Sequence, residues 1–424
     1  MTDPALVRAV ALFVPVLAVA ALLRWRPPGR AEIAAVILGT GWNVLALAVV
    51  NAVALRVGWW RFHVEGGAVA GVPVDLLLGW AVLWGGVAVL ALRRLHPLLV
   101  GALAVWLDLA VMPLGEPVVL LGPSWLTGEA VAALLALAPG LLLARWTLTG
   151  RRLMARVAMQ GVVAVGLMAA LPIALSDVPE RPVWALGLVA QALLVPAAVA
   201  AAAVGEFARA GRGTPLPYDP PSRLVTTGPY AYLRNPMQTA MTLTYLIVAP
   251  LDPVFLLGAA VAVSYGAGLA AWHEEEQLRA LHGPAWTRYR AAVRPWLPRP
   301  RPCLDTAPAV LWIAGGCDRC SPLAAWIARR SPVALEVRGA ETHPRGLRRM
   351  AYERLDGVRA EGVAAWAHAV GHLHLGWALL GWILLLPGVL QFAQLCADAF
   401  GAGPALHPVG AVSEGPSGAA DGAS

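Results

Sequence analysis

The chain has 424 residues, of which 58% are hydrophobic and only 13% charged, and its formal net charge is +7. So few polar residues exclude a soluble globular protein and favour an integral membrane protein. The sequence contains no lysine, and its arginines stand singly or in pairs between apolar runs, where membrane topology places basic residues, so the positive charge does not indicate nucleic-acid binding.

Seven apolar runs of about twenty residues predict membrane-spanning helices. Their approximate limits are 5–23, 31–55, 72–92, 98–112, 129–144, 157–175 and 183–204. Arginines gather on alternate connections, and the positive-inside rule then predicts a multi-pass protein of the cell (inner) membrane with its N-terminus outside and the 205–235 segment in the cytoplasm. No cleavable signal peptide is expected, because the first run ends at RWRPPGR without a small-residue cleavage site.

Few side chains within residues 1–175 are suited to chemistry. Asn43 and Asn51 lie eight residues apart and share a helical face, and Asp75 and Asp108 lie near the ends of spans. One interpretation is a polar stripe that faces a cavity. The favoured one is a set of interhelical hydrogen bonds and interfacial caps, because polar residues in membrane helices often only hold helices together.

The chain changes character after residue 204. The segment GEFARAGRGTPLPYDPPSRLVTTGPY is rich in Gly, Pro and Arg and cannot form one continuous helix. Two apolar helices are predicted next, from Met237 to Pro250 and from about Val254 to Trp272, with a break between them. They form a helical hairpin, so the polar segments before and after it, TTGPYAYLRNP and HEEEQLRALHGPAWTRYR, can meet at the cytoplasmic interface.

This pair of polar segments resembles a known signature. GPYAYLRNPM, a two-helix hairpin and EEEQLRALHGPAWTRYRAAVRPWLP are similar to the C-terminal part of the isoprenylcysteine carboxyl methyltransferase and phospholipid methyltransferase superfamily, over about residues 205–300. In that family the two-part motif binds S-adenosylmethionine at the cytoplasmic membrane interface. The resemblance implies a cofactor pocket lined by Tyr230, Arg234, Asn235, Pro236, Glu274, Glu275 and Tyr289. Many members carry His-Pro in place of Asn235-Pro236 and Phe-Gly in place of His282-Gly283.

The chemistry of the cofactor suits these residue types. S-adenosylmethionine carries a carboxylate, an ammonium group, a ribose diol and a sulfonium. Arg234 can clamp the carboxylate, a glutamate can accept a hydrogen bond from the ammonium group or the ribose, and the tyrosines can flank the adenine or the sulfonium. The acceptor is expected to be lipophilic, because a membrane-embedded site gives no advantage to a soluble one.

Two rival classes of function stay open. In the first, a non-catalytic membrane scaffold or transporter retains a degenerate methyltransferase fold and uses its C-terminal domain for regulation. In the second, the C-terminal domain is the only enzyme and the spans anchor it. Taken singly, the glutamates are also explained as a solvated juxtamembrane cap and Arg234 as a positive-inside anchor. Their combination at this spacing favours the methyltransferase.

A second type of motif follows the proline-rich linker PWLPRPRP. The stretch APAVLWIAGGCDRCSPLAAWIARR predicts a buried strand, a glycine turn and a helix that opens at Cys317, and VALEVRGA predicts another strand. This β–CxxC–α–β order is thioredoxin-like, and about residues 308–400 resemble the DCC-type thiol–disulfide oxidoreductases. That family usually has Asp-Gly before its first cysteine, where this chain has Ala314-Gly315-Gly316. A helix N-terminus lowers the pKa of a thiol, so Cys317 is the expected attacking thiolate and Cys320 the resolving thiol, with a thiol redox partner.

Metal binding is the alternative hypothesis for this region, but no metal site is predicted. A zinc site at the CxxC would need a second cysteine pair, whereas Cys303 and Cys396 are isolated. His368 and His372 share a helical face at metal-ligand spacing, but an interfacial helix face with snorkelling polar tips is favoured over a metal site there.

The predicted fold is an all-α polytopic membrane protein, with about seven spans and a C-terminal helical hairpin, joined to a small α/β thioredoxin-like domain. The apolar segment from Leu373 to Phe400 is expected to pack on that domain or lie on the membrane rather than span it. The predicted domains are N-terminal transmembrane helices at 1–175, a methyltransferase-like membrane domain at 176–302, the thioredoxin-like domain at 303–403 and a disordered tail at 404–424.

Overall fold

The computed structural model describes residues 3–404, except 64, 217–221 and 316–319 and the side chains of 269–274, 320 and 402. The chain divides into two compact units. The first unit comprises Met1–Leu188, Gly211–Ser222 and Val248–Val254, and the second comprises Val189–Ala210, Arg223–Ile247 and Phe255–Ser424. The tip of the predicted hairpin therefore belongs to the first unit, and most of its two helices belong to the second.

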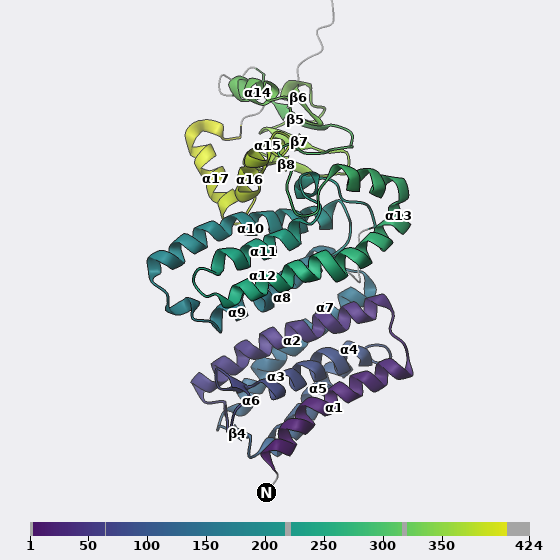
Figure 1. The fold of residues 1–424 in the computed structure, drawn as a ribbon, viewed down its shortest axis with the longest axis vertical. Coiled ribbons are helices and arrows are strands. Elements are labelled where there is room, and N and C mark those ends of the chain that lie inside the picture. Colours follow the sequence, from purple (N-terminus) through teal and green to yellow (C-terminus); the bar gives the residue numbers. More distant parts are fainter. Residues whose placement is uncertain (1–2, 64, 217–221, 316–319, 405–424) are drawn as a thin grey trace, which may run out of the picture. The chain divides into compact units, whose positions relative to one another are not determined.

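The first unit is built from helices (Figure 1). They are α1 (Pro4–Trp25), α2 (Arg30–Val57), α3 (Val74–Val82), α4 (Ala88–Ala91), α5 (Pro97–Val111), α6 (Trp125–Ala132), α7 (Ala138–Thr149), α8 (Leu153–Val165) and α9 (Leu171–Ala174). Single π-helical turns join α3 to α4, α6 to α7 and α8 to α9. Two short antiparallel strand pairs complete the unit: β1 (Trp60–Phe62) with β4 (Val119–Leu121), and β2 (Ala68–Val69) with β3 (Val72–Pro73).

Seven helices in the described part of the chain are long and apolar enough to cross a membrane. Their limits are Pro4–Trp25, Arg30–Val57, Val74–Ala91, Pro97–Gly115, Trp125–Thr149, Leu153–Ala174 and Val183–Arg209. They confirm the seven predicted apolar helices, with ends shifted by a few residues. Such runs form helices because a helix satisfies its own backbone hydrogen bonds where no water is present. The chain therefore has the make-up of a multi-pass membrane protein.

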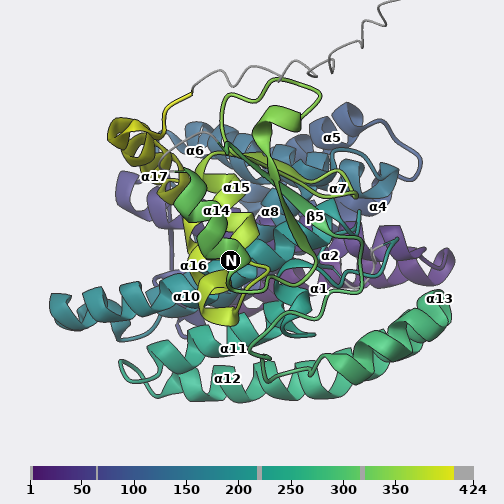
Figure 2. The same ribbon diagram turned by 90° about the horizontal axis from the view of Figure 1, so that it is seen from above.

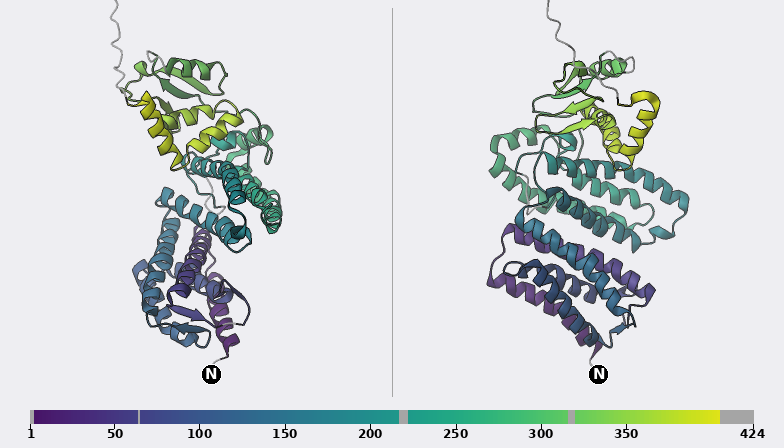
Figure 3. Two further views of the ribbon diagram at one scale, coloured as in Figure 1. Left: turned by 90° about the vertical axis from the view of Figure 1, so that its left-hand side faces the viewer. Right: turned by 180° about the vertical axis from the view of Figure 1, so that it is seen from behind.

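Glycines allow helices of the first unit to approach closely. A Cβ atom at Gly79 of α3 would lie 2.0 Å from the carbonyl oxygen of Ala11 in α1, and one at Gly85 would lie 2.3 Å from the backbone of Thr40 in α2. Small residues at such crossings let backbones pack directly against each other. Figure 3 shows this helical bundle, in purple to blue, from two further sides.

The predicted polar residues of the first unit bond both within α2 and between elements. Asn43 and Asn51 are buried, and each donates its Nδ2 hydrogen to the carbonyl oxygen four residues earlier in α2. Asn51 also accepts a hydrogen bond of 2.9 Å from the buried indole of Trp60. Asp75 pairs with Arg8 of α1 at 2.6 Å, and Asp108 is buried. The Asp75–Arg8 pair joins α3 to α1 as the favoured interpretation predicts, whereas Asn43 bonds within its own helix.

The second unit begins in α10 (Val183–Arg209) and continues with α11 (Pro236–Val248), α12 (Val254–Tyr265) and α13 (Ala271–Ala292). Figure 2 shows α10, α11 and α12 side by side, with α13 continuing from α12. The rings of Tyr245 in α11 and Phe255 in α12 lie 6.2 Å apart, as expected for a hairpin. The predicted helical hairpin is therefore present. A sharp turn at Gly283, with φ 45° and ψ −118°, divides α13 into two arms.

A four-stranded mixed sheet forms the C-terminal part of the second unit, in the order β6-β5-β7-β8. Its strands are β5 (Ala309–Ile313), β6 (Leu335–Gly339), β7 (Ala351–Glu353) and β8 (Arg359–Glu361), and its helices are α14 (Cys320–Ala328) and α15 (Val363–Val370). The pair β5–β6 is parallel, and β7 is antiparallel to both of its neighbours. This arrangement confirms the predicted strand–helix–strand order around the CxxC segment.

Successive residues of β5 point to opposite faces of the sheet, as a strand requires. Leu311 packs in a cluster with Ile327 of α14 and Ala365 of α15, while Trp312 packs with Ala340 and Leu347. After α15, the apolar segment forms α16 (Leu375–Leu384) and α17 (Val389–Ala397), and the two are bent by 94° relative to each other. Helix α16 packs closely on α15, where a Cβ at Gly381 would lie 2.4 Å from a carbonyl oxygen. The segment thus packs on the sheet domain, which was one of the two predicted alternatives. The predicted tail lies outside the described residues from 405 onward.

Candidate functional site

The structure brings the two predicted motif segments together. The motif loop, residues 226–236, runs through a 3-10 turn at Gly228–Ala231 into the start of α11. Its backbone bonds to the chain that follows α13: the amide of Arg234 donates to the carbonyl of Arg294 at 2.9 Å, and the amide of Asn235 to that of Pro295 at 3.2 Å. The meeting of the two segments, predicted from the hairpin, is confirmed.

A hydrogen bond between the two predicted tyrosines stabilises this junction. The hydroxyl of Tyr289 donates a hydrogen bond of 2.9 Å to the carbonyl oxygen of Tyr230, and both residues are buried. Burial raises the pKa of Tyr289 above its ordinary value, so its hydroxyl keeps its proton and acts as a donor. The ring of Tyr230 lies 6.1 Å from that of Phe207, and the ring of Tyr289 lies 5.9 Å from that of Trp286.

Arg234 stands at the surface of the same junction. Its guanidinium lies over the ring of Trp286, 5.6 Å from the centroid, and the structure shows it without a hydrogen bond or ion pair to any described side chain. Burial, and then the charge of Arg290, lower the pKa of Arg234 from its ordinary value. An arginine oriented by an aromatic ring, with no carboxylate partner among the described side chains, is suited to binding an anionic ligand group.

Glu275 joins the two arms of α13. Its Oε1 accepts from Arg279 at 2.9 Å and from Arg290, which reaches it across the turn at Gly283. The charge of Glu275 also acts on Arg234. An open pocket of about 700 Å³ is lined in the described part of the chain by Glu275, Glu276, Arg279 and Ala280.

The remaining predicted cofactor residues are Asn235, Pro236 and Glu274. Asn235 and Pro236 form the start of α11, where the carbonyl of Asn235 accepts from the amide of Thr239 at 3.0 Å. Proline is favoured at this position because the first helical turn needs no amide donor there. The side chain of Glu274 lies outside the described residues.

The CxxC pair is described only in part. Cys317 falls in the 316–319 gap, and Cys320 is the first residue of α14, with a side chain outside the described set. Cys303 and Cys396 are free thiols. Among the residues that the structure describes, no group of three or more His, Cys, Asp or Glu side chains is arranged to hold a metal ion.

The preferred interpretation of the histidine pair is wrong for His372. This residue is buried rather than placed at an interface, and its Nδ1 lies 2.7 Å from the carbonyl oxygen of Val333. A carbonyl can only accept, so Nδ1 carries the proton and Nε2 accepts from the hydroxyl of Tyr352 at 2.9 Å. His368 stacks on the same Tyr352 ring, with centroids 5.3 Å apart.

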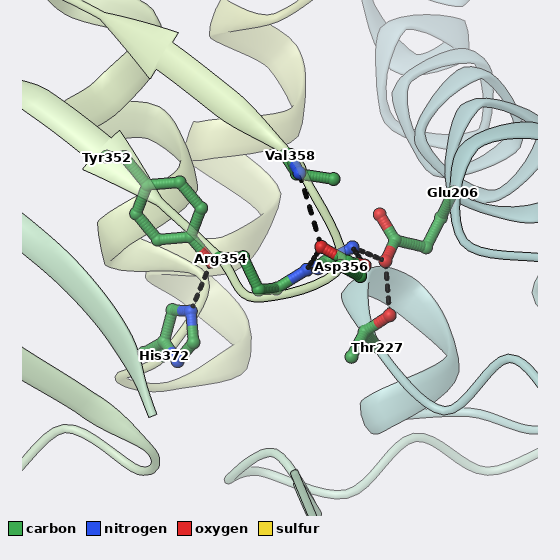
Figure 4. A network of polar contacts seen from close by, with 7 residues as sticks. All are labelled: Glu206, Thr227, Tyr352, Arg354, Asp356, Val358 and His372. Atoms are coloured by element: carbon green, nitrogen blue, oxygen red, sulfur yellow. Dashed lines mark hydrogen bonds and ion pairs between the residues drawn. The ribbon is translucent and has the colours of Figure 1, made fainter. Parts of the chain in front are cut away.

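A polar network beside the motif loop was missed by sequence reasoning (Figure 4). Glu206 near the end of α10 is buried and accepts from the hydroxyl of Thr227 and from Arg354 at 2.5 Å. Arg354 also binds Asp356, with bonds of 2.7 and 2.9 Å. Burial acts to lower the pKa of Arg354, but the hydrogen bond to Asp356 and the charge of Glu206 raise it overall. The one available signal was a lone glutamate at the end of an apolar run.

Comparison of the chain with family models, with characterised proteins and with solved structures found no significant match.

Proposed function

We propose that the protein is a membrane-embedded, S-adenosylmethionine-dependent methyltransferase that acts on a lipophilic acceptor. The observation that carries the proposal is Arg234, an arginine held over Trp286 where the two motif segments meet, without a described carboxylate partner. Glu275, whose charge acts on Arg234, also lines the open pocket. The resemblance of the motif segments to membrane methyltransferases supplies the identity of the cofactor.

In this proposal the chain's own residues bind and orient the cofactor. Arg234 clamps the carboxylate of S-adenosylmethionine, and the glutamates of α13 accept from its ammonium group or ribose. The lone pair of the acceptor atom forms a bond to the methyl carbon while the carbon–sulfur bond breaks and sulfur takes its electron pair. A carboxylate acceptor is already deprotonated and needs no general base. Positioning and exclusion of water then provide the rate enhancement.

Calorimetry on the full chain in detergent tests this function. We expect the wild-type protein to bind S-adenosylmethionine, and Arg288→Ala to bind it equally well, because the side chain of Arg288 is exposed and lies 4.0 Å from the exposed carboxylate of Asp305. Lack of binding at millimolar cofactor would reject the methyltransferase and favour the scaffold or transporter. Mass spectrometry of lipids from cells with and without the gene would then identify the acceptor by the gain of one methyl group.

We propose a thiol–disulfide exchange activity for the C-terminal domain as a second function. The observation behind it is the β5–α14–β6 order, in which Cys320 opens α14 and the two strands are parallel. The thiolate of Cys317 attacks a target disulfide and releases one target thiol, and Cys320 then displaces the second target sulfur. The resulting Cys317–Cys320 disulfide is returned to the dithiol by an external dithiol. Cys320→Ser should therefore accumulate a mixed disulfide that Cys317→Ser cannot form.

The cytoplasmic placement of both sites is also a proposal, based on the arginine distribution. Single cysteines introduced near Arg151 and near Arg209 should be shielded from an impermeant thiol reagent applied outside intact cells, whereas one near Ser124 should react. The reverse labelling pattern would place both sites on the outer face.

A further inference from the structure

The motif loop has a second anchor besides its junction with α13. Thr227, directly before the 3-10 turn, donates to Glu206 of α10, and the amide of Tyr230 donates to the carbonyl of Thr227 at 3.2 Å. Gly228 has φ +60°, and a Cβ there would lie 3.1 Å from Glu206. The loop therefore bends tightly over this one carboxylate, in a conformation that favours glycine.

Glu206 is held in turn by the C-terminal domain. Arg354 lies in the turn between β7 and β8, where its amide donates to the carbonyl of Val358 at 2.9 Å. Asp356 in the same turn binds the Nε and Nη2 side of the guanidinium and also accepts from the amide of Val358 at 3.3 Å. This turn fixes the arginine before it meets Glu206, so little rotamer freedom remains to be lost. Figure 4 shows the chain of contacts from Val358 to Thr227.

The next residues of the loop contact the same domain. The hydroxyl of Tyr232 donates to the carbonyl of Gly371 at 3.0 Å, and its ring meets Trp382 of α16 edge-on, with centroids 5.7 Å apart. Tyr230 and Tyr232 thus anchor the loop to different elements, the first near α13 and the second on the C-terminal domain. Arg234 follows these two anchors directly, so its position depends on both.

We propose that Arg354 is a positioning residue for the motif loop, and that the C-terminal domain holds the cofactor-binding arginine in place through the Arg354–Glu206–Thr227 contacts. This inference rests on the proposed function for its cofactor, but the holding of the loop can be measured without any ligand. Through these contacts the C-terminal domain is a structural part of the cofactor site, in addition to any thiol chemistry of its own.

The pair Arg354→Gln and Arg349→Gln provides the test. Arg349 is an arginine of the same domain that binds Asp398 with both of its terminal nitrogens, and it has no hydrogen bond or ion pair with the loop among the described residues, so it is a matched control. In the full chain in detergent, Arg354→Gln should lower the affinity for S-adenosylmethionine about tenfold or more, as misplacement of a binding group does. Arg349→Gln should leave it unchanged, and Arg354→Lys should restore part of it.

A double-mutant comparison and hydrogen exchange separate the possible outcomes. Glu206→Gln combined with Arg354→Gln should weaken binding no more than the stronger single change, because both act through one contact. Amide exchange at residues 230–235 should rise in Arg354→Gln and stay at the wild-type level in Arg349→Gln, whether or not cofactor binds. Unchanged exchange in Arg354→Gln overturns the inference. Raised exchange in a protein that never binds cofactor retains the positioning role and rejects the proposed function.

Discussion

Buried polar side chains are used differently in the two units of this protein. In the first unit some bond within their own helix, as Asn43 does to Gly39 and Thr147 to Leu143, and others join two elements in isolated pairs, as Arg8 and Asp75 do. In the second unit they join elements far apart in the sequence, as Glu206 and Arg354 do across 148 residues. The first unit is therefore held by close helix packing, and the second by packing together with specific polar contacts around the motif loop.

This difference predicts where each unit is vulnerable. A unit held by close backbone packing should lose stability when a glycine at a helix crossing is replaced by a larger residue. A unit built on directed contacts loses function when a single polar group is removed, even where the helices stay packed.

Gly85→Ala should have the largest effect on stability. The added Cβ would lie 2.3 Å from backbone atoms of Thr40, which cannot move aside as a flexible side chain can. We expect a loss of about 3 kcal/mol in the stability of the first unit, at the upper end of the usual cost of overpacking. Gly161→Ala is the control, because nothing lies within 4 Å of its new Cβ. Equal melting temperatures in detergent for the two variants would contradict the close-packing account.

Arg234→Ala should leave the fold intact and weaken cofactor binding. Loss of a charged hydrogen-bonded contact corresponds to about 1.5–3 kcal/mol, which calorimetry with S-adenosylmethionine would measure. Arg234→Lys should recover only part of the affinity, since an ammonium group keeps the charge but loses the bidentate fork. Asn235→His restores the residue that is common in the resembled family and should preserve or raise affinity.

The hypothesis of a non-catalytic scaffold or transporter predicts no effect of these variants. All three proteins would then reach the membrane in normal amounts with no change in cofactor binding or lipid methylation. In that case Arg234 and its neighbours would only anchor the hairpin.

Asn51→Ala should destabilise the first unit more than Asn43→Ala. Removal of Asn51 leaves the fully buried indole N–H of Trp60 without the acceptor that it has at 2.9 Å, and an unsatisfied buried donor costs about 1–3 kcal/mol. The Nδ2 group of Asn43 donates only to its own helix, so its removal should cost less. Thermal unfolding of the two variants under the same conditions would decide, and a larger loss for Asn43→Ala would contradict this ranking.

The same contrast explains how much could be predicted from sequence. The seven long helices and the hairpin follow from the length and composition of apolar runs, which are local properties. The strands β5 and β6 and the meeting of the two motif segments also followed from local patterns and chain direction. The contacts of Glu206 with Arg354 and of Tyr232 with Gly371 depend on tertiary packing, and no local pattern in either segment indicates its distant partner.

The histidine pair shows the same limit. Spacing predicted that His368 and His372 share a helical face, but α15 ends at Val370 and His372 lies in the turn after it. Both histidines contact Tyr352, which comes from a strand that precedes the helix. Sequence reasoning could recognise two histidines at ligand spacing. It could not recognise that the ring of Tyr352 stacks on His368, or that both ring nitrogens of His372 already bond to Tyr352 and to the carbonyl of Val333.

The stability of the second unit should depend on pH through these two histidines. Burial is the main cause that lowers the pKa of each from 6.5 to about 4, and the charge of Arg354 acts in the same direction. The unfolded chain therefore binds more protons than the folded one between about pH 4 and 6.5. Their contribution to stability is complete above about pH 6.5 and is lost as the pH falls toward 4.

His368→Phe isolates this effect, because phenylalanine can keep the stacking on Tyr352 without titrating. Protonation of one histidine changes the free energy of unfolding by at most about 1.4 kcal/mol per pH unit. The wild type should therefore lose about 1 kcal/mol more stability than His368→Phe between pH 7 and 5.5. An identical loss in the wild type and in His368→Phe would mean that the folded protein accommodates a charged imidazole beside Tyr352, and that water reaches this part of the second unit.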